Sequence, residues 1–193
     1  MATNDVGVLL FGGRRTPRAL RGLPTISVDQ ATDFRRLVVV GADKDLAAVL
    51  KQLLRADRLD IEVAQVRRSW TARRALTGSA TRVPLIRDET GSVIIGAAVW
   101  VGENSALTGE AVVDDTVLFD GEVTAVRVEP IPDQPGLRAT VLTRHMRPSR
   151  WVTGRAAQLG TPGAFVVRDG EMSARPVKRS TFYRHTQGWL SVR

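Results

Sequence analysis

The sequence predicts a mixed α+β protein, in which a small α/β lobe at residues 1–80 is followed by a larger antiparallel β-sandwich-like lobe at residues 81–193. Two observations predict this order. The apolar run LVVV at 37–40 is followed by an amphipathic stretch and a further apolar run, which is the pattern of a β-α-β unit. After residue 81, short β-rich runs follow one another closely with turn residues between many of them, as in antiparallel sheets.

The first lobe contains predicted strands, a loop and helices. In order, they are a strand at 6–10, a proline- and glycine-containing loop at 14–30, a strand at 37–40, a helix at 45–55, a strand at 61–66 and a short basic helix at 68–78. The run at 37–40 has no polar residue, as expected for a strand buried on both faces. In the helix at 45–55, leucine and valine recur at helical spacing, which indicates one buried face.

The second lobe is predicted to be built from strands alone. They are placed at 82–87, 92–101, 111–119, 122–130, 137–143, 150–158, 164–168, 174–184 and 188–192. The tripeptide Asp-Gly-Glu occurs at 120–122 and again at 169–171, each time between an apolar and an alternating run. Because glycine tolerates the positive φ of tight turns, we interpret both copies as hairpin turns, and Thr161-Pro162-Gly163 as another turn.

The composition restricts the chemistry of the protein. The absence of cysteine excludes disulfides, thiolate zinc sites and cysteine nucleophiles. The histidines, His145 and His185, do not have a metal-binding spacing, so no metal site is predicted. No apolar run approaches the ~20 residues that cross a bilayer, and the apolar run at 6–11 lacks the pattern of a secretory signal. We therefore expect a cytoplasmic protein without a transmembrane segment.

The net charge of +8 is carried almost entirely by arginine, since lysine occurs only at 44, 51 and 178. Such a charge favours anionic partners, which include nucleic acid, phospholipid surfaces and phosphate-bearing small molecules. The densest basic patch contains Arg144, Arg147, Arg150 and Trp151. It is a candidate anion-binding site, and the alternative is a solvated loop whose tryptophan packs inward. Gly12-Gly13-Arg14-Arg15 is interpreted as a strand-end turn with solvated arginines rather than a phosphate grip.

The order of the lobes and the late Asp-Gly-Glu resemble the diacylglycerol kinase and sphingosine kinase family of lipid kinases, which have an NAD kinase-like fold. That family has a GGDGT loop between strand and helix, a GTxNDFAR loop after the next strand, and a late DGE in a β-sandwich lobe. Here GADKD at 41–45 and AQVRRSWTARRALTG at 64–78 stand in the places of the first two motifs. The resemblance extends loosely over 37–193 and is strongest over 150–193.

The resemblance implies roles for the late motif. In the family, the glutamate of DGE is the general base on the lipid hydroxyl, and the aspartate is linked to magnesium. Glu171 would accordingly be the base and Asp169 its neighbour. The same resemblance places a phosphate loop at Gly41, Asp43 and Lys44.

The phosphate loop departs from the family pattern. Ala42 and Lys44 stand where the family has glycines, and Asp45 stands where it has threonine. Glycine-rich turns hold phosphate through converging N–H groups that no Cβ blocks, and an added carboxylate repels a triphosphate. The second motif lacks its asparagine, and the first lobe is short for a complete nucleotide domain. We therefore expect a degenerate, truncated nucleotide lobe.

Three functions follow, in order of preference. The first is a non-catalytic lipid-kinase-like protein that binds an anionic, phosphate- or lipid-bearing ligand or a partner, with no certain cofactor. The alternative is an active ATP-dependent diacylglycerol-type lipid kinase, a phosphotransferase that needs ATP and Mg²⁺. The second alternative is a basic β-rich module that binds nucleic acid. A homodimer formed through an exposed edge strand is a further prediction.

Overall fold

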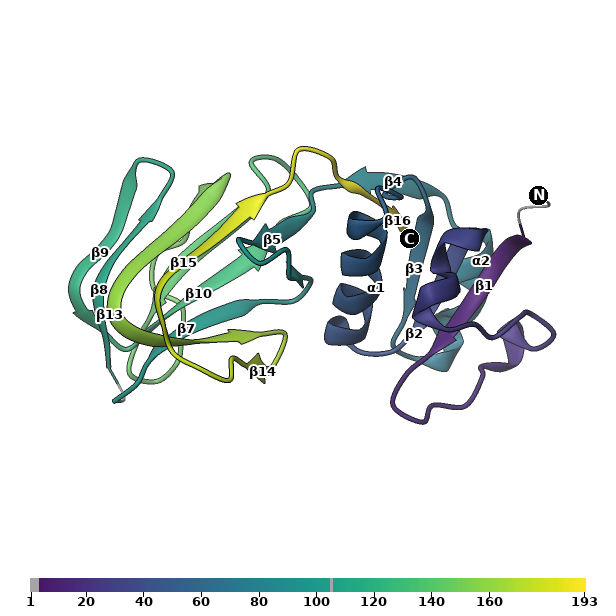
Figure 1. Ribbon diagram of the computed structural model, residues 1–193, viewed down its shortest axis with the longest axis horizontal. Coiled ribbons are helices and arrows are strands. Elements are labelled where there is room, and N and C mark those ends of the chain that lie inside the picture. Colours follow the sequence, from purple (N-terminus) through teal and green to yellow (C-terminus); the bar gives the residue numbers. More distant parts are fainter. Residues whose placement is uncertain (1–3, 105) are drawn as a thin grey trace. The chain divides into compact units, whose positions relative to one another are not determined.

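The computed structural model describes residues 4–104 and 106–193 and divides the chain into two compact units (Figure 1). The first unit runs to Val83 and includes the returning segment Gln187–Arg193, and the second is Pro84–Thr186. The boundary predicted from the sequence lies between residues 80 and 81, with the last strand in the second lobe. In the structure this strand lies in the sheet of the first unit.

The first unit contains a five-stranded sheet in the order β1-β2-β3-β16-β4. Its strands are β1 Asn4–Leu10, β2 Phe34–Val40, β3 Glu62–Val66, β16 Trp189–Val192 and β4 Ala80–Val83. All neighbouring pairs are parallel except β16 with β4. The helices are α1 Asp43–Arg55 and α2 Ala72–Thr77, with 3-10 turns η1 Arg18–Leu20, η2 Val28–Asp33 and η3 Ser69–Thr71.

Both faces of this sheet are covered. On one face, buried strand residues such as Val38 and Ala64 pack with Ala72 and Ala75 of α2. α1 lies on the other side of the sheet (Figure 1) and buries the apolar face that its spacing predicts. Because β1, β2, β3 and β16 are parallel, their carboxyl ends lie at one edge, which is where open α/β sheets bind ligands.

The second unit is an antiparallel sheet of eleven strands. The main path is β12-β11-β10-β7-β13-β15-β5-β6, with β8 and β14 pairing with β13 and β9 pairing with β8. The strands are β5 Ile86–Asp88, β6 Val93–Ile94, β7 Ala98–Gly102, β8 Leu107–Val113, β9 Thr116–Val123, β10 Ala125–Pro130, β11 Leu137–Leu142, β12 Val152–Gly154, β13 Ala156–Arg168, β14 Glu171–Met172 and β15 Val177–Arg184.

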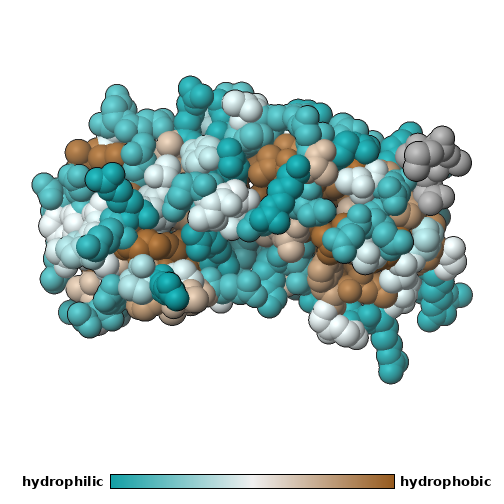
Figure 2. Space-filling view, viewed as in Figure 1, coloured by the Kyte–Doolittle hydropathy of each residue, from teal (hydrophilic) through white to brown (hydrophobic). Residues whose placement is uncertain are grey.

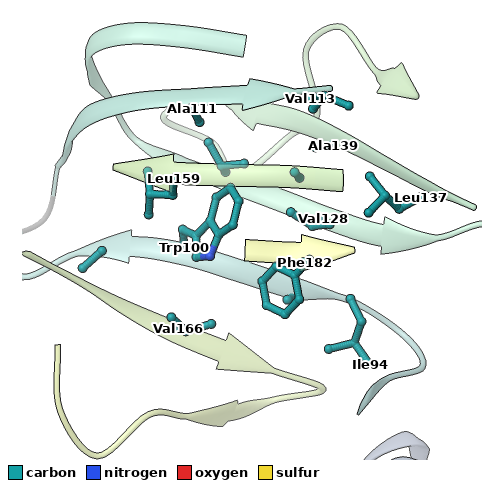
Figure 3. Close-up of a cluster of buried hydrophobic side chains, with 14 of the residues drawn as sticks. Ile94, Trp100, Ala111, Val113, Val128, Leu137, Ala139, Leu159, Val166 and Phe182 are labelled. Carbon is teal, nitrogen blue, oxygen red and sulfur yellow. The ribbon is translucent and has the colours of Figure 1, made fainter. Parts of the chain in front are cut away.

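The core of the second unit is centred on Trp100 and Phe182, whose rings point into its interior (Figure 3). The ring centroids are 5.7 Å apart and the planes are 27° from parallel. The indole N–H of Trp100 donates a hydrogen bond of 3.0 Å to Ser180 Oγ, which satisfies the only polar atom of that buried side chain. These contacts connect β7 with β15, which lie on either side of β13 in the sheet.

The predicted fold class is confirmed, because a mostly parallel sheet with helices is followed by a larger antiparallel sheet. Two predicted turns are wrong. Asp120-Gly121 lies within β9, where Gly121 faces Gly109 of β8, and the chain instead turns after Asp114, inside the predicted strand 111–119. Asp114 adopts a φ of 52° and its carboxylate accepts the N–H of Arg155, so long-range contacts place this turn.

The other wrong turn is Thr161-Pro162-Gly163, which lies within β13. The register of β13 with β15 shifts between Gly160 and Ala164. The strand can therefore pair with β8 before this irregularity and with β7 after it. Proline is tolerated in a strand at such an irregularity because no ladder hydrogen bond is needed there.

No helix in the part of the chain that the structure describes is long and apolar enough to cross a membrane. Hydrophilic side chains cover most of the face shown in Figure 2, with small apolar patches between them. This surface is consistent with the charged content of 25% in the sequence.

Candidate functional site

The late Asp-Gly-Glu forms the predicted tight turn. Asp169 and Gly170 are the two residues between β13 and β14, and their φ angles are 47° and 90°. Two positive φ values in a two-residue hairpin loop are typical of a type I′ turn, for which Asp-Gly is a preferred sequence. Glu171 begins β14, pairs with Arg168 across the hairpin and is exposed.

The Asp169 carboxylate binds the backbone between β6 and β7. One oxygen accepts the N–H groups of Gly96 at 2.7 Å and Ala97 at 3.1 Å, and the other accepts that of Ile95 at 3.0 Å. The N–H of Asp169 donates to the carbonyl of Ala97 at 2.9 Å. The three side-chain bonds have a charged acceptor and the fourth is a backbone bond to the same segment, so Asp169 joins the hairpin to the loop between β6 and β7.

The same hairpin is held by a buried ion pair. Arg168 places its guanidinium 2.6 Å from the carboxylate of Asp88, which is completely buried. The other oxygen of Asp88 accepts the N–H groups of Thr90 at 2.8 Å and Ser92 at 2.9 Å. All these contacts orient the hairpin that carries Glu171, and they give Asp88 the partners that a buried carboxylate requires.

The GADKD turn connects β2 to the first turn of α1. An oxygen of the Asp45 carboxylate accepts the N–H of Ala42 at 2.7 Å. A Cβ added at Gly41 would lie 2.6 Å from that oxygen and 2.8 Å from the Cβ of Asp45. The carboxylate of Asp45 thus fills the space beside Gly41. It places a negative charge of the chain's own at the N-terminus of α1.

Asp43 is also engaged. Its carboxylate accepts a hydrogen bond of 3.0 Å from Gln65 Nε2 and forms an ion pair with Arg67, both at the end of β3. Lys44 is exposed on the same turn of α1. The turn therefore presents two carboxylates, and an N–H group that a phosphate would need is already bonded.

The basic patch predicted at 144–151 lies in the loop between β11 and β12. Arg144, Arg147 and Arg150 are exposed, and the loop is closed by the N–H of Thr143, which donates to the carbonyl of Arg147 at 2.9 Å. Trp151 is half-buried. The structure thus brings the predicted arginines into one solvated loop of the second unit.

One face of Trp151 is covered by Arg138, whose guanidinium lies 4.1 Å from the ring centroid. Arg138 also forms an ion pair of 2.7 Å with Glu129, which pairs with Arg127 at 2.6 Å. Burial acts to raise the pKa of Glu129, but hydrogen bonds from Arg138 and Arg127 outweigh it, so the pKa of Glu129 is lowered. The Arg138 guanidinium, held by Glu129, therefore covers one ring face of Trp151.

Sequence reasoning missed a second basic surface, at the carboxyl edge of the first sheet. The segment Arg67–Arg74 follows β3 and contains Trp70, whose side chain is 74% exposed. Beside it lies a pocket of about 360 Å³ whose lining includes Thr71, Arg74 and Arg193. The sequence signal was present in the letters RRSWTARR, which were interpreted as a short basic helix and as part of the segment in the place of the second family motif.

Metal ligation has no candidate in the described ranges 4–104 and 106–193, where no group of three or more His, Asp or Glu side chains is arranged to hold an ion. The predicted site residues lie on the Asp-Gly-Glu hairpin and the arginine loop, both in the second unit, and on the GADKD turn in the first.

Comparison with protein-family models finds no match, and no curated protein sequence matches the chain. Solved structures do match. A diacylglycerol kinase from Bacillus anthracis str. Sterne has a TM-score of 0.72 at 12% identity, over 100% of this chain and 97% of that one. An NAD kinase from Archaeoglobus fulgidus in complex with ATP has a TM-score of 0.66 at 12% identity, over 98% and 93%. The expected resemblance is confirmed at the level of structure: this chain has the fold shared by diacylglycerol kinase and NAD kinase.

Proposed function

We propose that this chain is a non-catalytic protein with the diacylglycerol kinase fold, which binds an anionic phosphate- or lipid-bearing ligand without using ATP. The observation that carries the proposal is the hydrogen bond from the N–H of Ala42 to the carboxylate of Asp45. This bond occupies the helix N-terminus at the position where a phosphate loop is expected from the family resemblance.

The electrostatic cost of a triphosphate at this turn is large. Two like charges 4 Å apart repel by about 4 kcal/mol at an effective dielectric constant of 20. Since each 1.4 kcal/mol is a factor of about ten in affinity, one uncompensated carboxylate lowers phosphate affinity by several hundredfold. Asp43 is neutralised by Arg67, whereas the carboxylate of Asp45 accepts a hydrogen bond from the uncharged backbone N–H of Ala42.

The active-kinase alternative draws its support from the ordered hairpin and the exposed Glu171. In that alternative Glu171 is the general base and Asp169 its neighbour. Asp169, however, already accepts three backbone N–H groups, which suits a role in holding the hairpin better than one in organising magnesium. Phosphoryl transfer depends on positioning and charge neutralisation, so a base without a phosphate cradle achieves little.

The anionic ligand is assigned to the arginine loop at 144–151. Exposed Arg144, Arg147 and Arg150 offer guanidinium groups, which bind phosphate with paired hydrogen bonds. A nucleic acid is less favoured as the ligand, because base stacking on Trp151 competes with Arg138 for one ring face.

The test is a calorimetric titration of the purified chain with Mg-ATP and, separately, with glycerol phosphate. We expect no saturable binding of Mg-ATP at millimolar concentration. Glycerol phosphate should bind, and Arg144→Gln/Arg147→Gln/Arg150→Gln should lose that binding. The matched control is Arg18→Gln/Arg21→Gln/Arg175→Gln, which removes three exposed arginines from other places. Tight binding of Mg-ATP by the natural chain would contradict the proposal.

A further inference from the structure

The segment Arg67–Arg74 gathers an exposed aromatic ring and four exposed arginines. Trp70 is the most exposed large apolar side chain among the described residues. From residue 63 to residue 87 the sequence contains neither aspartate nor glutamate. This surface is therefore both strongly cationic and locally apolar, a combination that neither the fold nor the GADKD turn requires.

The backbone of the segment is held in place by local hydrogen bonds and by small side chains buried against the sheet. Thr71 donates both its N–H and its hydroxyl to the carbonyl of Arg68, at 3.0 and 2.8 Å. Ala72 and Ala75 are buried against the sheet in the core of the first unit. Because these small residues anchor η3 and α2, Trp70 projects into solvent from an ordered turn rather than from a loose loop.

The charges of the segment are mostly uncompensated. Arg67 pairs with Asp43, whereas Arg68, Arg73 and Arg74 have no ion-pair partner in the part of the molecule that the structure covers. Arg14 adds a further cation, since its guanidinium donates to the carbonyl of Arg67 at 3.0 Å. The arginine side chains thus remain available for external anions.

We propose that the segment Arg67–Arg74 docks the protein on an anionic phospholipid bilayer. Trp70 enters the headgroup region, where an indole with an apolar body and a polar N–H is favoured. Arg68, Arg73 and Arg74 contact lipid phosphates around it, through the planar donor groups that suit phosphate. Binding of this type is reversible, because it rests on one inserted side chain and a few charges.

A bilayer fits this surface better than a nucleic acid does. Single-stranded nucleic acids are held by several aromatic platforms along a charged groove. Among the described large apolar side chains that are exposed, Trp70 is the one aromatic ring. One exposed ring, Trp70, surrounded by arginines matches the flat surface of a bilayer, where phosphate groups surround every point of insertion. The proposal goes beyond the anion-binding function above, since it uses neither the arginine loop nor the GADKD turn.

The experiment is co-sedimentation of the full chain with phosphatidylcholine vesicles, with and without phosphatidylglycerol. We expect binding only to the anionic vesicles, weakening as salt rises. Arg73→Gln/Arg74→Gln should lower vesicle affinity about 25-fold, which is about fivefold for each arginine near a surface. Trp70→Ala should lower vesicle affinity about tenfold, because the apolar ring that the bilayer removes from water is lost. The affinity of Trp70→Phe should lie between those of Trp70→Ala and the natural chain.

The matched control is Arg175→Gln/Arg179→Gln, which removes the same charge from exposed positions of the second unit. We expect it to change vesicle affinity less than about threefold, the effect of net charge alone. Equal losses in both double variants, or unchanged binding in Trp70→Ala, would overturn the proposal. Tighter binding of a single-stranded oligonucleotide than of vesicles would overturn it as well. Arg144→Gln/Arg147→Gln/Arg150→Gln separates this proposal from the proposed function: it should keep vesicle binding, and loss of vesicle binding in that variant alone would overturn the proposal.

Discussion

The carboxylate of Asp45 lies 2.7 Å from the backbone nitrogen of Ala42 and accepts its hydrogen bond, which caps the first turn of α1. A carboxylate near a helix N-terminus stabilises the helix by interaction with its dipole and its unbonded N–H groups. The same contact occupies a position at which a bound phosphate would act. Under the proposed function, the stability of the first unit and nucleotide binding compete for this one N–H group.

The cap predicts a measurable loss of stability. Asp45→Ala should lower the free energy of unfolding by about 1 kcal/mol, because it removes the acceptor for Ala42 N–H and the favourable charge. Urea denaturation followed by circular dichroism provides the measurement. Asp5→Ala is the control, since the Asp5–Arg35 pair is exposed and separated by 4.0 Å. Equal effects of the two substitutions would mean that Asp45 is not a cap.

Asp169 is predicted to support structure rather than a metal. Asp169→Ala should lower the free energy of unfolding by about 2–3 kcal/mol, because N–H groups of Ile95, Gly96 and Ala97 lose a charged acceptor. Glu122→Gln, an exposed substitution in β9 of the same unit, should stay within about 0.5 kcal/mol. Both variants are compared by denaturation with and without magnesium. Stabilisation by magnesium that Asp169→Ala abolishes would favour the metal role instead.

The buried pair Asp88–Arg168 should matter more than an exposed pair. Arg168→Met leaves a fully buried carboxylate without its cation, and we expect a loss of about 3–5 kcal/mol in unfolding free energy. The comparison is Arg58→Met, which breaks the exposed pair with Asp60 and should cost at most about 1 kcal/mol. Chemical denaturation of both variants measures the difference, and similar losses would contradict the account.

Glu129 predicts a pH dependence of stability. Its pKa is lowered in the folded protein, because hydrogen bonds from Arg138 and Arg127 outweigh the opposing effect of burial. Its contribution is therefore fully present above the unfolded-state pKa of about 4.3 and is lost as pH falls through the lower folded value. Unfolding free energies measured from neutral pH to about pH 3 should decline less steeply for Glu129→Gln than for the natural chain. An unchanged slope would show that Glu129 is not engaged.

The sequence predicted those parts of the fold that local patterns determine. The β-α-β unit predicted at 37–66 and the Asp169-Gly170 turn follow from periodicity and from the φ requirements of glycine. The first Asp-Gly copy fails as a turn because Gly121 faces Gly109 across β8 and β9, a relation between strands that neither sequence neighbourhood encodes. The return of β16 to the first sheet is non-local in the same way.

The candidate site was predictable in its residue types but not in its contacts. The extra carboxylate at Asp45 is visible in the letters GADKD, yet its bond to Ala42 and the pairing of Asp43 with Arg67 depend on how β3 lies beside β2. Trp70 was overlooked because exposure is a property of the folded chain. A tryptophan at helical spacing among arginines reads equally well as a core residue.

Calorimetric titration tests whether Asp45 prevents the GADKD turn from binding Mg-ATP. Mg-ATP is titrated into the natural chain and into a variant with the family loop restored. Ala42→Gly/Lys44→Gly/Asp45→Thr converts GADKD into GGDGT while keeping Gly41 and Asp43. We predict no saturable binding of Mg-ATP to the natural chain at millimolar ATP and a gain of binding in the restored variant. Asp45→Thr alone should give part of that gain. Saturable binding of Mg-ATP to the natural chain that Asp45→Thr leaves unchanged would contradict the account.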